Sequence, residues 1–115
     1  MDALANTTGG QQMTVPTSER VGLYLSIVEP GDWSLSHCAE TLGLSESTLC
    51  RQLRREGTRF KTLMDDVRTH RAIEFLRDGH KTWVAANLVG MADSYCLARL
   101  FRRRGLCVTD FRRAA

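Results

Sequence analysis

Arginine is unevenly placed along this chain of 115 residues. Residues 45–115 carry 15 of the 16 basic side chains against eight acidic ones, a formal charge of +7, whereas residues 1–44 sum to −4. Most of these basic residues are arginine. The guanidinium group offers a planar fork of N–H donors that matches phosphate oxygens and guanine edges. The second part of the chain therefore favours a polyanionic partner, and nucleic acid is the class to which it points.

Two segments place these arginines on one side of a helix. At 100° per residue, the first segment, 45–56, buries Leu49 and Leu53, and the second, 94–104, buries Leu97 and Phe101. The sides opposite these pairs carry Ser47, Cys50 (at the edge), Arg51, Arg54 and Arg55 in the first segment, and Tyr95, Ala98, Arg99, Arg102 and Arg103 in the second. Because both helices repeat the arrangement in the same register, a merely solvated surface is the weaker interpretation.

A tight corner precedes each of these segments. Ala39 is followed four residues later by Gly43, and Ala86 is followed four residues later by Gly90. The small side chain lets two helices cross closely, and the glycine supplies the left-handed backbone that turns the chain. The apolar pair beyond the corner then pins the next helix and leaves its other side free to enter a major groove. The sequence predicts two helix-turn-helix units.

The remaining pattern is also helical. Apolar spacing and turn residues predict one helix from Thr17 to the Pro30–Gly31 pair, further helices over about 36–42, 45–56, 59–77, 82–89 and 94–104, and a short turn over 108–113. Thr17 or Ser18 is the expected cap of the first helix. We expect an all-α fold of about seven helices. It has a first helix-turn-helix subdomain over 17–57, a linker helix over 58–78 and a second subdomain over 79–115. Residues 1–16 lack periodicity and indicate a disordered leader that contains a tag-like stretch.

From about Val21 to Arg113 the chain resembles the AraC/XylS-type DNA-binding domain of transcription regulators. The matching residues are Leu35, Ala39, Gly43-Leu44-Ser45, Leu49, Arg51, Leu53, Glu56-Gly57, Phe60, Val67-Arg68, Arg71-Ala72, Phe75-Leu76, Ala86, Gly90-Met91, Leu97, Arg99, Phe101-Arg102-Arg103 and Phe111-Arg112. The resemblance implies two helix-turn-helix units joined by a long central helix. It also implies two recognition helices that enter successive major-groove segments on one face of bacterial DNA. Sequence-specific binding of double-stranded DNA for transcription regulation is the expected function.

Site roles follow from that expectation. We expect contacts to bases from Ser47, Cys50, Arg51, Tyr95, Ala98 and Arg99, with Arg51 and Arg99 on guanine edges. We expect contacts to phosphates from Arg54, Arg55, Arg102, Arg103 and Arg104, which set affinity rather than sequence. Double-stranded DNA is the expected partner and RNA polymerase a second one. The chain is expected to be a monomer in the cytoplasm, at the nucleoid, and a longer protein could dimerise through a domain absent here. No membrane, cofactor or metal is expected.

An enzyme is the first alternative, and the sequence argues against it. Asp65 and Asp66 are adjacent on a helix and point about 100° apart, and His70 has no nucleophile at a matching spacing. No two cysteines form a C-x-x-C pair, so buried thiols are a better interpretation than zinc ligands. The cysteines are Cys38, Cys50, Cys96 and Cys107.

Two further alternatives stay open. One is a helical protein-interaction module that keeps the fold, for which Trp33 and Trp83 are candidate contact residues. The other is a regulator in which only the first unit reads bases.

Overall fold

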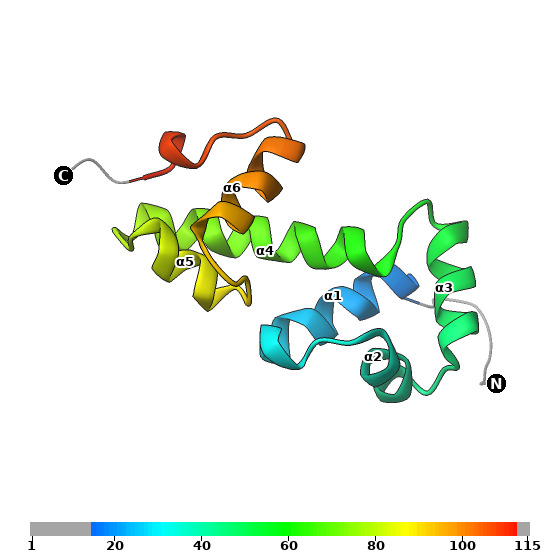
Figure 1. Cartoon of the computed structure of the whole chain (residues 1–115). Coiled ribbons are helices and arrows are strands. Elements are labelled where there is room, and N and C mark those ends of the chain that lie inside the picture. Colours follow the sequence, from blue (N-terminus) through cyan, green and yellow to red (C-terminus); the bar gives the residue numbers. More distant parts are fainter. Residues whose placement is uncertain (1–14, 113–115) are drawn as a thin grey trace.

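The computed structural model describes residues 15–112, and every regular element in this range is a helix, as predicted (Figure 1). The elements are α1 Thr17–Ile27, η1 Pro30–Asp32, α2 Leu35–Leu42, α3 Glu46–Arg55, α4 Phe60–Arg77, α5 Thr82–Leu88, α6 Ser94–Arg103 and η2 Val108–Asp110, where η1 and η2 are single 3-10 turns. Apart from residues 15 and 16, the predicted leader lies outside the described residues, as does the end of the predicted last turn. No helix in the described range is long and apolar enough to cross a membrane.

The described chain has two separate hydrophobic cores. The first core is built on α1, α2 and α3 and contains the buried residues Val21, Tyr24, Leu25, Cys38, Ala39, Leu49 and Leu53. The second is built on α5, α6 and the end of α4 and contains Ala72, Leu76, Ala85, Ala86, Val89, Leu97, Leu100, Phe101 and Val108. Both fold because apolar residues recur at helical spacing and bury one side of each helix. Each core supports one helix-turn-helix unit.

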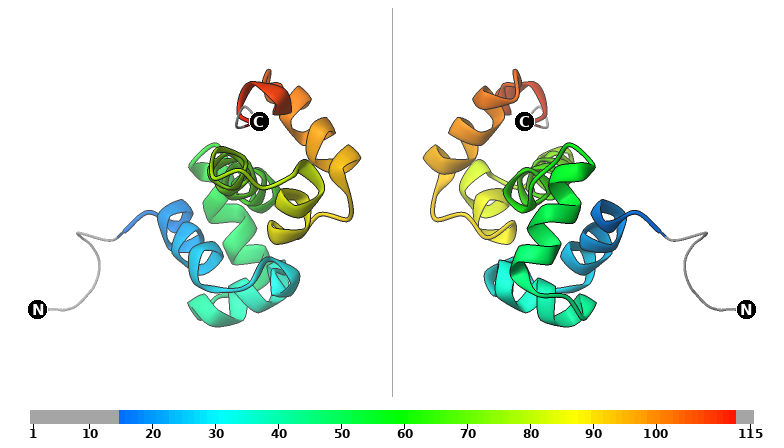
Figure 2. Two further views of the ribbon diagram at one scale, coloured as in Figure 1. Left: turned by 90° about the vertical axis from the view of Figure 1, so that its left-hand side faces the viewer. Right: turned by 90° about the vertical axis from the view of Figure 1, so that its right-hand side faces the viewer.

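Helix α4 belongs to both units rather than only joining them. Its first half packs Phe60, Leu63, Met64 and Val67 against the first core. Its second half contributes Ala72 and Leu76 to the second core. The stretch between these halves is polar, so the two cores do not merge. Viewed along α4, α1 lies on one side of this helix and α5 and α6 lie on the other (Figure 2).

The two predicted corners have the same geometry. Gly43 and Gly90 adopt φ values of 74° and 82°, in the left-handed region that glycine tolerates best. After each glycine, the next amide returns to the alanine carbonyl, from Leu44 to Ala39 at 2.8 Å and from Met91 to Ala86 at 2.9 Å. This pairing satisfies carbonyls that the helix end leaves open. The alanine–glycine spacing is thus explained by a helix C-cap that each unit repeats.

The N-terminus of α1 corrects one prediction. Thr17 and Ser18 do not cap this helix, because Pro16 is the N-cap residue and has no side chain that accepts a hydrogen bond. Instead the carboxylate of Glu56, just beyond α3, accepts the Thr17 amide at 2.8 Å and the Ser18 amide at 2.9 Å. A carboxylate also suits the positive end of the helix dipole. The N-terminus of α1 is therefore hydrogen-bonded to the residue that follows α3.

Candidate nucleic-acid interface

Helix α3 presents arginines to solvent from a firmly held position. Ser45 caps the helix by accepting the Thr48 amide at 3.1 Å, and Leu49 and Leu53 are buried in the first core. Ser47, Arg51, Arg54 and Arg55 are exposed, as the helical spacing predicted, and Cys50 is half-buried at the edge of this side. The Arg51 guanidinium makes a 3.4 Å contact to the Thr48 hydroxyl. This side of α3 can therefore contact an anionic ligand without first losing a core contact.

Helix α6 repeats the design with a different cap. Asp93 accepts the Cys96 amide at 2.9 Å, and this hydrogen bond holds the pKa of the Asp93 carboxyl below its usual value. Leu97 and Phe101 are buried, as predicted, and so is Leu100. The exposed side carries Tyr95, Arg99, Arg102, Arg103 and Arg104, whereas Ala98 is half-buried against the second core. Of the predicted base-contacting residues, Cys50 and Ala98 are the two that the fold half-buries.

Two residues of α6 are oriented together. Tyr95 is 65% exposed, and the Arg99 guanidinium carbon lies 5.7 Å from the centroid of its ring. Such a cation–aromatic contact limits the positions that a long arginine side chain samples. Within the described residues, no carboxylate lies within 4 Å of Arg99, nor of its counterpart Arg51 on α3. Both candidate base-reading guanidinium groups are therefore uncommitted to an acid in this part of the chain.

The last two predicted phosphate contacts are placed differently. Arg103 lies 3.4 Å from the carboxylate of Asp65, and Arg104 is paired with Asp66. At 100° per residue, Asp65 lies near Lys61 on α4, whereas Asp66 lies toward the opposite side. Arg103 can contact a phosphate and leave Asp65 paired, because Lys61 also lies 3.4 Å from the Asp65 carboxylate. A phosphate contact from Arg104 would require its ion pair with Asp66 to break.

The exposed sides of α3 and α6 open onto adjoining grooves. One groove is lined by Leu35, Cys50, Leu53, Arg54, Thr58, Arg59, Phe60 and Lys61. The other is lined by Lys61, Asp65, Arg68, Met91, Cys96, Arg99 and Arg103. Since Lys61 lines both, the two grooves meet at the first turn of α4. Both helices also run toward the top of the molecule in Figure 1.

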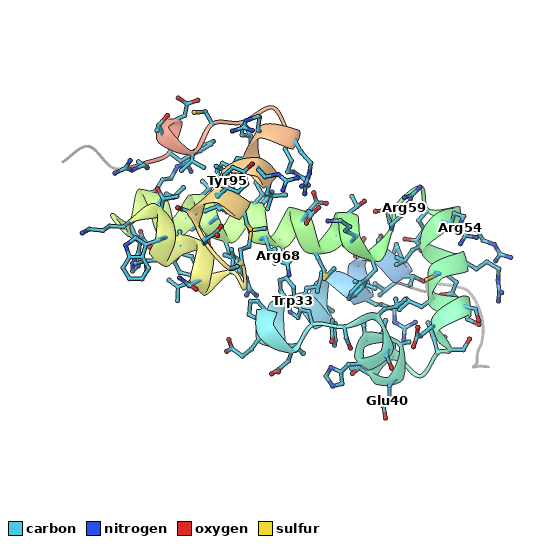
Figure 3. All side chains as sticks on the ribbon, viewed as in Figure 1. Trp33, Glu40, Arg54, Arg59, Arg68 and Tyr95 are labelled. Atoms are coloured by element: carbon cyan, nitrogen blue, oxygen red, sulfur yellow. The ribbon has the colours of Figure 1, made fainter. Side chains whose placement is uncertain are left out.

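The structure adds basic residues that the sequence did not single out. Arg59, just before α4, and Lys61, in its first turn, lie between α3 and α6. Arg59 is exposed, and the Lys61 side chain is 70% exposed. Figure 3 shows Arg59 beside Arg54 at the junction of α3 and α4. Helical spacing did not predict these two residues, because it describes the sides of one helix at a time. This cluster forms only when α3 is folded onto the start of α4.

The remaining candidate chemistry does not converge. Among residues 15–112 there is no group of three or more His, Cys, Asp or Glu side chains that could hold a metal ion. Cys38 is fully buried, and burial raises the pKa of its thiol to about 11, which keeps it protonated. His70 is exposed on α4. Of the two tryptophans, Trp33 is half-buried and Trp83 is 58% exposed.

Comparisons with known proteins agree with this geometry. No protein-family model matches the chain. The HTH-type transcriptional activator FapR from Escherichia coli is 31% identical over 91 residues, which cover 78% of this chain and 35% of FapR. The transcriptional regulator CdpR from Pseudomonas aeruginosa is 32% identical with a TM-score of 0.77 over 85% of this chain and 32% of CdpR. The chain is therefore similar to helix-turn-helix transcription regulators, in agreement with the resemblance of its sequence to the AraC/XylS-type DNA-binding domain.

A third comparison covers a whole solved chain. The crystal structure of a DNA-binding transcriptional dual regulator from Escherichia coli K-12 superposes on this domain with a TM-score of 0.79 and 23% identity. That match covers 89% of this chain and 94% of the other, and it establishes the fold. The chain spans about a third of the length of FapR and of CdpR. The fold predicted from the sequence is confirmed by these matches.

Proposed function

We propose that this chain is an AraC/XylS-type domain that binds double-stranded DNA sequence-specifically and thereby regulates transcription. In this proposal α3 and α6 enter successive major-groove segments on one face of the duplex. The observation that carries the proposal is the position of Lys61, which lines both the groove beside α3 and the groove beside α6. It supports a single basic surface, because one side chain borders both the groove that contains Arg54 and the groove that contains Arg99 and Arg103.

Helix α4 supports the spacing that this binding mode needs, because both recognition helices pack against it. Helix α3 precedes the first turn of α4, and α6 contacts α4 through the pairs Arg103–Asp65 and Arg104–Asp66. The positions at which α3 and α6 meet α4 fix their separation, and one turn of DNA, ~34 Å, is the distance between neighbouring segments of the same major groove. A site read by one copy of this domain is therefore expected to be asymmetric and to have two parts about one turn apart.

Individual roles follow from exposure and geometry. Arg51 and Arg99 are proposed to read guanine edges, because each is exposed and free of a carboxylate partner among the described residues. The other proposed base contacts are Ser47, Cys50, Tyr95 and Ala98. The proposed phosphate contacts are Arg54, Arg55, Arg59, Lys61, Arg102 and Arg103. Arg104 joins them only if its pair with Asp66 opens.

The proposal extends to the setting of this chain. The DNA-binding unit is proposed to act as a monomer in the cytoplasm, at the nucleoid, without catalysing a reaction, and RNA polymerase is proposed as its second partner. The names of the relatives support transcription regulation, since FapR is described as an activator and CdpR as a regulator. The sign of regulation is a property of those whole proteins.

The decisive experiment is selection of bound duplexes from a random library. We expect the chain to enrich one asymmetric sequence with two conserved parts about one helical turn apart. DNase footprinting of the selected duplex with Arg51→Ala and with Arg99→Ala should then show loss of protection in different parts of the site. If the library yields no enrichment, the chain is an interaction module that keeps the fold. If Arg99→Ala changes nothing, only the first unit reads bases.

A further inference from the structure

Arg68 is the one described side chain that contacts both helix-turn-helix units through its guanidinium group. Its Nε donates a hydrogen bond to the Val89 carbonyl at 3.2 Å, at the end of α5 in the second unit. Its guanidinium carbon also lies 5.3 Å from the centroid of the Trp33 ring, just after η1 in the first unit. The side chain is only 18% exposed. Figure 3 shows Trp33 and Arg68 next to each other beneath α4.

Arg71 completes the contact with Trp33 from one turn further along α4. Its guanidinium carbon lies 5.9 Å from the same ring centroid. Its Nη2 donates to the carbonyls of Leu25 and Ser26, at the end of α1, at 3.1 and 3.0 Å. The Trp33 indole N–H is itself fixed, because it donates to the Val28 carbonyl at 2.8 Å. The ring is therefore held by its own segment and flanked by two cations of α4.

A second contact joins the units directly. A methyl group placed on Gly90 would come within 2.8 Å of the Cβ of Pro30, so the η1 turn of the first unit packs against the corner of the second. Figures 1 and 2 both show η1 beside the turn that follows α5. This close approach needs a glycine at position 90 for packing as well as for its backbone conformation. Gly43, the equivalent glycine of the first unit, has no such neighbour.

These contacts occupy the part of the molecule where no core holds the units together. The first core ends on α4 at Val67 and the second begins at Ala72. We propose that Trp33, Arg68 and Arg71, with the Pro30–Gly90 contact, form a clamp that fixes the orientation of the second unit relative to the first. The clamp sets the DNA spacing that the domain accepts. These residues are positioning residues, and this inference rests on the proposed function.

The orientation can be measured without DNA. Residual dipolar couplings of backbone amides in the complete chain should fit one alignment tensor for both units. We expect two tensors, from independently moving units, in Trp33→Ala and in Arg68→Met. The matched controls Trp83→Ala and Arg77→Met should keep one tensor, because Trp83 is exposed on α5 and Arg77 stacks on Phe111 inside the second unit. If both clamp variants keep one tensor, the clamp does not exist.

The consequence for DNA can be measured separately. The probe is the duplex selected by the wild-type chain, together with versions in which one or two base pairs are inserted or removed between its two parts. A rigid pair of units should lose about tenfold or more in affinity on respacing, whereas loosely tethered units should lose less than about threefold. We expect the first behaviour in the wild type and both controls, and the second in Trp33→Ala and Arg68→Met. Equal respacing losses in all five proteins would overturn the role in specificity.

The two experiments separate this inference from the function on which it rests. If the wild-type chain selects no sequence, the proposed function fails, and the dipolar couplings still decide whether the clamp orients the units. If selection succeeds while the couplings of both clamp variants fit one tensor, the function stands and the clamp is wrong. Arg68→Met keeps an apolar stem of similar length, so it serves the measurement if Trp33→Ala fails to fold.

Discussion

At the scale of single residues, the two kinds of arginine on α3 should fail differently. Arg51 is proposed to read bases and Arg54 to hold a phosphate. Arg51→Ala should cost about 1–3 kcal/mol on the selected duplex and relax preference at one position, whereas Arg54→Ala should weaken selected and random duplexes by a similar factor. Fluorescence anisotropy on both duplexes measures this. Identical behaviour of the two variants would refute the division between base and phosphate contacts.

The two corner glycines form a second residue-scale comparison. Both have positive φ, so alanine at either position is strained by about 1–2 kcal/mol. Nothing lies within 4 Å of a methyl group at Gly43, whereas one at Gly90 meets Pro30 at 2.8 Å. Gly90→Ala should therefore lose about 1–3 kcal/mol more stability than Gly43→Ala, because overpacking adds to the strain. Urea unfolding of both variants tests this, and equal losses would show that the Pro30 contact relaxes freely.

At the scale of helices, the sequence predicted local features well and distant ones poorly. Ser45 and the glycines at 43 and 90 act on neighbours within a few residues, so spacing alone revealed them. The cap of α1 was mispredicted because its acceptor, Glu56, lies 39 residues from Thr17. Local propensity favours Thr17 and Ser18 as caps, but the fold brings a stronger acceptor to the same amides.

The Glu56 cap predicts a pH dependence. Partial burial acts to raise the pKa of the Glu56 carboxyl, but hydrogen bonds from Ser18 and Thr17 outweigh it and hold the pKa below its ordinary 4.5. Because the folded pKa is the lower one, this stabilisation is complete above pH 4.5 and is lost as the pH falls through the folded value. The urea midpoint of wild type should thus exceed that of Glu56→Gln at about pH 7, and the difference should shrink as the pH falls below 4.5.

A matched substitution controls for the loss of an acidic charge in that experiment. Glu40 is exposed on α2 and points away from the molecule in Figure 3. Glu40→Gln should leave the urea midpoint close to wild type throughout this pH range. A constant gap between wild type and Glu56→Gln across the acid range would mean that Glu56 stabilises the fold through something other than its charge.

At the scale of the whole molecule, the sequence predicted which sides of α3 and α6 carry the site but not how the two sides are joined. Periodicity fixes the faces of one helix, and Leu49, Leu53, Leu97 and Phe101 are buried accordingly. The joining residues Lys61 and Arg68 act between elements, so neither stands out in any single helical pattern. From the sequence, Asp65 was considered only as a catalytic residue and rejected. In the structure its carboxylate instead forms ion pairs with Lys61, Arg68 and Arg103.

The joined surface makes a prediction about salt. Each neutralised phosphate contributes about −0.9 to the slope of log affinity against log salt, so the six proposed phosphate contacts predict a slope of about −5. Lys61→Ala should make the slope less steep by roughly 0.9 and leave base preference intact. Arg77→Ala should not change it, because Arg77 lies on the opposite side of α4 from Lys61 at 100° per residue. If both variants changed the slope equally, affinity would depend on total charge, and the basic surface from Arg54 through Lys61 to Arg103 would not be the DNA-binding face.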